Sequence, residues 1–261
     1  MRLQIDVTLD YHVPAPAEVL LAVEVAQLPD QRLLDDRLTV DGATGPLTPI
    51  AGEDGIGRRT WLKADGRLHA AYRATVEVTR TLAPLDALPL CPLAELPAEA
   101  IAYLWPSRYC QSDQFETFVE RRFGELAGGA RLLAMRDWIQ DEMDYAPGSS
   151  DTTTTAADAF VARAGVCRDY AHLLASFARA AGVPARLASV YAPGLKPPDF
   201  HAVVEVWLGG AWHLLDATGL APADGFVRIC VGRDATDIAF MTIFGSATLN
   251  GQSVTVTRLP A

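Results

Sequence analysis

Cys167 is the residue with the clearest potential for chemistry. It opens a predicted helix that runs to Ala181 and ends at the stop signal Gly182-Val183-Pro184. In the first turn of a helix, a sulfur faces unpaired backbone N–H groups and the positive end of the helix dipole, and both stabilise a thiolate. The same N–H groups can hold a developing oxyanion. The position therefore favours a nucleophilic thiol.

Cys167 also fits an ordinary buried cysteine, because an apolar stripe follows it along the helix. The other three cysteines lack a helix start, and we interpret them as structural: Cys91, Cys110 and Cys230. None of the four forms a C-x-x-C pair, so we expect reduced thiols and neither a disulfide framework nor a structural zinc site.

The clearest hairpin in the chain supplies a base. Its strands span residues 201–208 and 211–218, and the dipeptide Gly209-Gly210 forms the turn. With a two-residue or four-residue loop, His201 and Asp216 lie on one face as diagonal neighbours, about 7 to 8 Å apart between backbones. A hydrogen bond between imidazole and carboxylate closes this gap, so we predict that Asp216 orients His201. A three-residue loop would shift the register by one and separate the two.

Two other histidines are poorer choices for the base. His213 has the opposite parity in the hairpin and faces the other side of the sheet. His172 lies five residues past Cys167, about 500 degrees around the helix, and so points away from the sulfur. We interpret both as structural histidines.

Cysteine, histidine and aspartate in these places form the nucleophile, base and orienting group of thiol acyl transfer. Thiolate, imidazole and carboxylate also suit zinc, so a metal site built from Cys167, His201 and Asp216 is an alternative. The acyl-transfer hypothesis needs no cofactor.

Composition narrows the function classes. Of 261 residues, 50% are hydrophobic and 21% charged, which is typical of one or two compact domains. The net charge of -10 and the lack of a Lys/Arg-rich run argue against a nucleic-acid partner. The start alternates apolar and polar residues and carries Asp6 and Asp10, unlike a signal peptide, and no apolar run is long enough to span a membrane. We expect a cytoplasmic protein without membrane contact; oligomeric state is open.

The pattern of the chain divides it in two. Residues 1–95 hold strand-like segments separated by turns and predict an antiparallel β unit. A Pro-rich linker, residues 83–97, leads into residues 96–261, where helical periodicity gives way to strands again. Near the end, Asn250-Gly251 predicts a hairpin turn.

The segment GVCRDYAHLLASFARAAGVPAR around Cys167, followed by His201 after 34 residues and Asp216 after 15 more, resembles the bacterial transglutaminase-like cysteine peptidase family. Further similar phrases are SRYCQSD, the Ser149-Ser150-Asp151 loop and VGRDATD. The resemblance covers nearly the whole chain. It implies an α+β fold, in which an N-terminal antiparallel β-sandwich domain (1–95) precedes a papain-like, transglutaminase-like core (96–261) of helices packed on an antiparallel sheet.

The resemblance also implies thioester chemistry on a peptide or protein substrate. The favoured activity is a cysteine peptidase or amidase that hydrolyses a peptide or amide bond. Protein cross-linking, deamidation and a catalytically silent binding module with the same core are alternatives, because one fold serves several reactions. Tyr109 and Asp169 match recurrent family positions and are predicted to bind substrate. Trp207, on the predicted face of His201, is a third such prediction.

Overall fold

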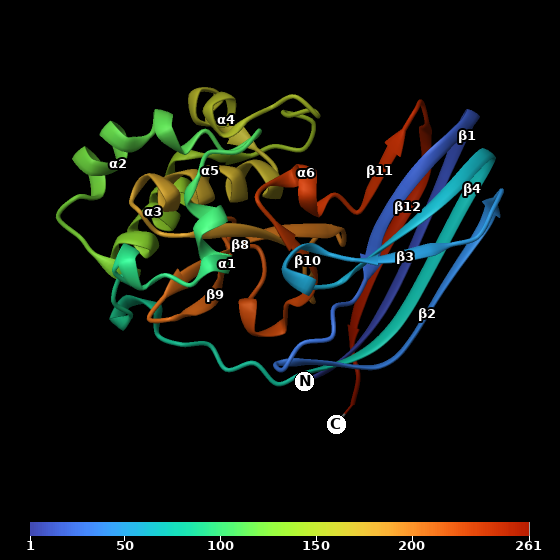
Figure 1. The fold of residues 1–261 in the computed structure, drawn as a ribbon, viewed down its shortest axis with the longest axis horizontal. Helices are drawn as coiled ribbons and strands as arrows, with labels where there is room; N and C mark the ends of the chain where they lie inside the picture. Colours follow the sequence, from blue (N-terminus) through green and yellow to red (C-terminus); the bar gives the residue numbers. More distant parts are fainter. Residues whose placement is uncertain (261) are drawn as a thin grey trace.

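The structure of the chain is a computed structural model, and it describes residues 1–260. Two antiparallel sheets dominate it, and the helices gather around one of them (Figure 1). The predicted α+β class is thereby confirmed, with a strand-rich first part and a core of helices packed on an antiparallel sheet. No helix within 1–260 combines the length and apolarity that crossing a membrane requires.

The first sheet has six strands and is built on two very long ones, β1 (Arg2–Glu24) and β4 (Arg58–Val78), which pair with each other. Alternate residues of β1, such as Leu3, Ile5 and Val7, are buried, which is the period-two pattern seen in the sequence. β4 also pairs with the shorter strands β2 (Gln31–Ala43) and β3 (Thr48–Ala51).

The last two strands of the chain complete this first sheet. Strands β11 (Met241–Phe244) and β12 (Thr248–Arg258) both pair with β1, end to end along the edge opposite β4. The predicted division assigned them to the 96–261 unit, whereas they hydrogen-bond to the first strand. The predicted hairpin turn at Asn250-Gly251 is wrong, because Asn250 is an extra residue that bulges out of β12.

The second sheet carries the predicted hairpin. Its order is β10 (Val227–Gly232), β7 (Ala185–Tyr191), β8 (Phe200–Leu208) and β9 (Ala211–Leu215). Gly209 and Gly210 form the two-residue turn, with φ of 55° and 84°. Glycine adopts these positive values at no steric cost. Leu208 pairs with Ala211, which is the predicted register.

Helix α5 (Cys167–Ala180) packs against strand β8 and forms the centre of the helical layer. Most of its residues are buried, including the polar residues Asp169, His172 and Arg179. The other helices are α1 (Ala98–Ile101), α2 (Glu116–Phe123), α3 (Gly128–Glu142), α4 (Ala156–Ala162) and α6 (Ala235–Ile238). Short 3-10 turns occur at Glu53–Gly55, Leu85–Ala87, Leu93–Glu95, Ala102–Leu104, Ser112–Gln114 and Ala223–Gly225. A two-stranded parallel sheet joins β5 (Asp144–Tyr145) to β6 (Ala164–Gly165) just before α5.

Candidate active site

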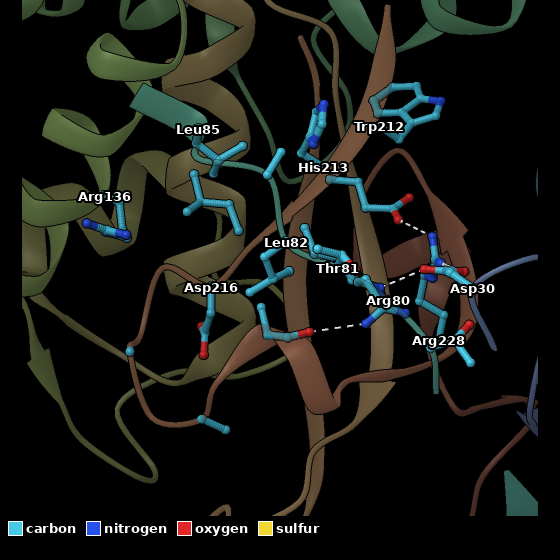
Figure 2. Close-up of a pocket in the computed structure, with 18 of the residues that line it drawn as sticks. Asp30, Arg80, Thr81, Leu82, Leu85, Arg136, Trp212, His213, Asp216 and Arg228 are labelled. Atoms are coloured by element: carbon cyan, nitrogen blue, oxygen red, sulfur yellow. Dashed lines mark hydrogen bonds and ion pairs between the residues drawn. The ribbon is translucent and has the colours of Figure 1, made fainter. Parts of the chain in front are cut away.

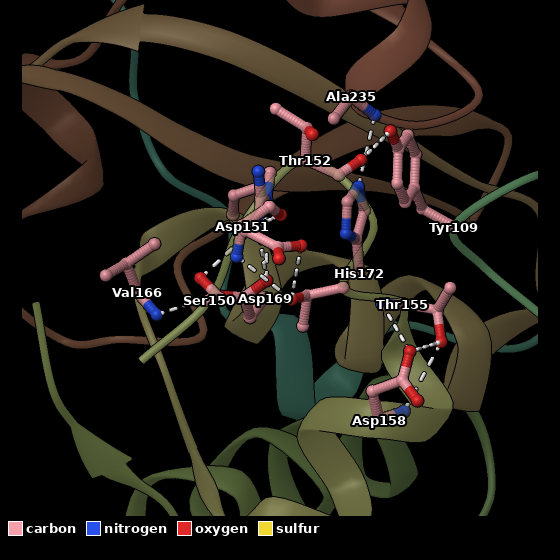
Figure 3. Close-up of polar contacts among 12 residues, drawn as sticks. Tyr109, Ser150, Asp151, Thr152, Thr155, Asp158, Val166, Asp169, His172 and Ala235 are labelled. Atoms are coloured by element: carbon pink, nitrogen blue, oxygen red, sulfur yellow. Dashed lines mark hydrogen bonds and ion pairs between the residues drawn. The ribbon is translucent and has the colours of Figure 1, made fainter. Parts of the chain in front are cut away.

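Cys167 is the first residue of α5, as predicted. Val166 precedes it in extended backbone and donates its N–H to the Asp169 carboxylate at 2.9 Å. Ser150 donates its hydroxyl to the same carboxylate at 2.6 Å, so the loop that precedes α4 also holds the helix start (Figure 3). A Cβ on Gly165 would lie 2.6 Å from the Asp169 Cβ, which explains the glycine. The position of the thiol is therefore fixed by a buried cap.

His201 and Asp216 meet as the hairpin register predicted. His201 Nε2 lies 3.0 Å from Asp216 Oδ2, and both residues are buried. The other carboxylate oxygen accepts bonds from the Thr218 N–H and hydroxyl, each at 2.8 Å. A carboxylate can only accept, so Nε2 carries a proton and Nδ1 is the nitrogen left for another group. Nδ1 is buried and has no hydrogen-bond partner within residues 1–260.

The charge state of His201 reflects its two neighbours. Burial disfavours the imidazolium form, but the hydrogen bond to Asp216 and the interaction with the Cys167 sulfur outweigh it and raise the pKa of His201 to about 9. At neutral pH the ring is therefore protonated, the state that pairs with a thiolate. Burial raises the pKa of Cys110 to about 11 and that of Cys230 to about 12, so these two thiols stay protonated at neutral pH.

Cys167 and His201 line one cavity of about 600 Å³. Its walls come from several elements, and most of them are apolar. The residues that line it include Tyr109, Phe200, Phe240, Met241 and Ile243. The cavity gives a carbonyl substrate room beside the thiol.

A larger cavity of about 730 Å³ is lined in part by residues of β9, among them Trp212 and His213 (Figure 2). Asp30, Arg80, Trp212 and Arg228 contribute to its walls, and Asp216 reaches it from the hairpin. No cysteine lines this larger cavity, so the volume of a cavity does not by itself identify the active site. The cavity with Cys167 and His201 is the one where the reactive groups meet.

The three predicted substrate-binding residues lie in different places. Tyr109 lines the cavity, and its hydroxyl donates to the Thr152 carbonyl at 2.6 Å. Asp169 is fully buried beneath the start of α5 and does not line the cavity. Trp207 stands six residues from His201, roughly 20 Å along an extended strand, and packs edge-on against Trp212. The structure thus brings Tyr109 alone of the three to the cavity wall.

The structural interpretation of His172 agrees with its surroundings. Its ring is fully buried and stacks on Tyr109, with 5.1 Å between centroids. Nε2 accepts the Ala235 N–H at 3.1 Å, which ties α5 to α6 (Figure 3). Burial lowers the pKa of His172 to about 3, so the ring stays neutral.

Sequence reasoning missed Tyr145. The β5–β6 pairing places Tyr145 opposite Gly165, two residues before the nucleophile. Burial raises the pKa of Tyr145 to about 12, and the nearby Cys167 sulfur acts in the same direction. A parallel bridge of two residues leaves no periodic pattern, and no signal in the sequence predicts this contact.

The alternative of a zinc site was tested against the arrangement of possible metal ligands. Within residues 1–260, no group of three or more His, Cys, Asp or Glu side chains is arranged to hold a metal ion.

Comparisons with known proteins identify the family of the chain. Residues 118–217, which contain Cys167, His201 and Asp216, match the family model "Transglutaminase-like superfamily". A solved structure described as "a Putative Cysteine Protease" from Cytophaga hutchinsonii is 36% identical, with a TM-score of 0.91 over 100% of this chain and 91% of that one.

Two further matches are more distant. An uncharacterised protein of Mycobacterium leprae is 29% identical over 41% of this chain and 42% of its own length, so the match spans less than half of that relative. The periplasmic domain of TgpA from Pseudomonas aeruginosa is 18% identical, with a TM-score of 0.45 over 82% of this chain and 76% of that one. On the family model and the full-length match at 36% identity, the chain belongs to the transglutaminase-like superfamily.

Proposed function

We propose that the protein is a thiol-dependent acyl-transfer enzyme that hydrolyses a peptide or amide bond of a peptide or protein substrate. The observation that carries the proposal is that Cys167 and His201 line the same cavity, while Asp216 Oδ2 lies 3.0 Å from Nε2 of His201. Cys167 is the nucleophile, His201 the base and acid, and Asp216 the residue that orients the ring.

The chemistry proceeds in two halves. The Cys167 thiolate attacks the substrate carbonyl, and the C–S bond forms as the carbonyl oxygen becomes an oxyanion. Backbone N–H groups in the first turn of α5 stabilise that oxyanion. The His201 imidazolium then gives its proton to the leaving amine, and the C–N bond breaks to leave a thioester on the sulfur. Water, deprotonated by His201, attacks the thioester and releases the acid and the thiol.

Asp216 keeps the ring in the orientation that this cycle needs. Because Nε2 donates to Asp216, Nδ1 is the nitrogen that exchanges the proton with the sulfur and the leaving group. Both oxygens of Asp216 are occupied, so the carboxylate has little freedom to turn. This arrangement supports a role in orientation and in stabilising the imidazolium.

Intact-mass spectrometry after incubation with mixed peptides tests the proposal. We expect an acyl adduct on Cys167 and peptide products that have gained water. The matched control is Cys91→Ala, which removes the other partly exposed cysteine and should leave the adduct unchanged, whereas Cys167→Ala should abolish it. Products coupled to an added amine would redirect the proposal to transamidation, and a wild-type protein that never acquires an adduct would exclude acyl transfer.

A further inference from the structure

Strand β11 has a free edge. It pairs with β1 on one side and ends the strand order of the first sheet, so no strand of the described chain occupies its other side. Exposed edges of natural sheets are usually protected by charged residues or proline, because they invite pairing with another chain. β11 reads Met-Thr-Ile-Phe and carries neither. Its edge is open to a partner strand.

The register identifies which backbone groups of β11 point outward. Ala22 donates to the Phe240 carbonyl at 2.8 Å, so this pair is hydrogen-bonded. Hydrogen-bonded and non-hydrogen-bonded pairs alternate along antiparallel strands. Thr242 therefore turns its N–H and C=O toward β1, while Met241 and Ile243 turn theirs toward the free side.

This free side faces the cavity of Cys167. Three consecutive residues of β11, Met241, Thr242 and Ile243, all line that cavity. Successive side chains of a strand point to opposite faces, so a face alone would contribute only every second residue. An uninterrupted run means that the edge itself is turned to the cavity. Figure 1 shows β11 on the side of its sheet that faces the helical core.

We propose that the substrate is an extended polypeptide segment that adds to the free edge of β11 as an extra strand and so brings an amide carbonyl to Cys167. Main-chain hydrogen bonds to Met241 and Ile243 supply affinity in this mode, and neighbouring pockets supply selectivity. Phe200 and Phe240 stack at 4.3 Å on the wall of the cavity and offer an apolar surface to a substrate side chain. The inference rests on the proposed thiol chemistry and adds how the chain is held.

Alkylation of Cys167 separates binding from chemistry. Iodoacetamide reacts with the thiol alone, whereas acetyl-Ala-Ala-Ala chloromethyl ketone also presents an extended backbone; in both, the sulfur displaces the halide.

Ile243→Pro removes the outward N–H and leaves the ladder to β1 intact, because proline is tolerated at edge positions whose N–H faces outward. Arg258→Pro is the matched control. The Leu259 N–H donates to β1, and because hydrogen-bonded and non-hydrogen-bonded pairs alternate, the Arg258 N–H points away from β1. Arg258 lies at the far end of β12 from the cavity.

We expect Ile243→Pro to slow alkylation by the peptide reagent about three- to tenfold, the effect of one lost hydrogen bond, with the iodoacetamide rate unchanged. Arg258→Pro should match the wild type with both reagents. Should Ile243→Pro not fold, N-methylation of the reagent's backbone tests the same bonds on the wild-type protein and should slow it similarly.

Three outcomes are distinguishable. If iodoacetamide does not label Cys167 in preference to Cys91, the proposed thiol chemistry fails first. If Cys167 is reactive but neither Ile243→Pro nor N-methylation of the reagent slows alkylation by the peptide reagent, edge pairing is wrong. A concentration-dependent dimer that Ile243→Pro abolishes, with unchanged peptide alkylation, would assign the edge to a second copy of the chain instead.

Discussion

At the residue scale, parity along one hairpin predicted the most specific feature of the site. His201 and Asp216 share a face because the turn has two residues, and their hydrogen bond of 3.0 Å follows from that register. The same reasoning set His213 aside, and His213 bonds the Leu208 carbonyl at 3.1 Å instead. Tyr145 escaped prediction because its neighbour in space, Cys167, is reached through a bridge of two residues.

The raised pKa of His201 makes activity depend on pH in a defined direction. The imidazolium loses its proton as pH rises through about 9, so we expect activity to fall above that value. Asp216→Asn removes one cause of the raised pKa, and the alkaline limb of the kcat/KM profile should therefore move to lower pH. We also expect kcat to fall by about 10²- to 10⁴-fold, because the ring loses its orienting carboxylate. A profile whose alkaline limb stays in place would contradict the role of Asp216.

Tyr145 beside the thiol gives a second prediction at this scale. A phenol there can donate to the oxyanion that forms on the substrate, together with the N–H groups of α5. We expect Tyr145→Phe to lower kcat by about 10- to 100-fold with little change in KM, because the contact matters only in the transition state. Tyr11→Phe, in the first sheet, serves as the control. Equal changes in kcat and in thermal stability would indicate packing instead.

At the scale of elements, the start of α5 was predictable but its support was not. Gly165, Cys167 and Asp169 mark a helix start in the sequence. The bond from Ser150 to Asp169 depends on a loop that returns from elsewhere, and local patterns do not encode such contacts. The short distance from Gly165 to the Asp169 side chain is likewise visible only in three dimensions.

Two helix caps of the same type differ in burial and allow a matched comparison. Asp169 is fully buried and bonds Val166 and Ser150, whereas Asp158 caps α4 with Thr155 at the surface. We expect Asp169→Ala to lower the free energy of unfolding by about 2–3 kcal/mol, because it leaves buried donors unpaired. Asp158→Ala should cost only about 0.5–1 kcal/mol. Urea titration measures both, and a larger effect at Asp158 would show that burial does not set the value of these caps.

At the scale of the whole molecule, the pairing of the chain's two ends could not be predicted. Leu3 pairs with Arg258 and Leu21 with Met241, across almost the full sequence. Strand patterns indicate that a segment is a strand, but they do not name a partner so far away. This pairing brings β11 to the cavity, so the wall opposite Cys167 belongs to the sheet that the chain begins with.

A buried ion cluster joins the two sheets. Glu205 of β8 is fully buried and accepts from Arg186 at 2.6 Å and from Arg228 at 2.7 Å. Each arginine continues to a carboxylate of the first part of the chain: Arg186 to Asp54 at 2.7 Å, and Arg228 to Asp30. Glu205 is therefore the carboxylate that the two arginines share, and each arginine has one further partner in the first part of the chain.

Removing Glu205 should thus loosen the whole molecule and not only one strand. We expect Glu205→Ala to lower the free energy of unfolding by about 3–5 kcal/mol, because two arginines stay buried without their shared partner. Asp6→Ala breaks an exposed pair with Arg73 and should cost less than about 1 kcal/mol. If the cluster joins the sheets, tryptophan fluorescence and far-ultraviolet circular dichroism should report one coincident urea transition in the wild type and two separated ones in Glu205→Ala. A single, unshifted transition in that variant would mean that apolar packing alone holds the sheets together.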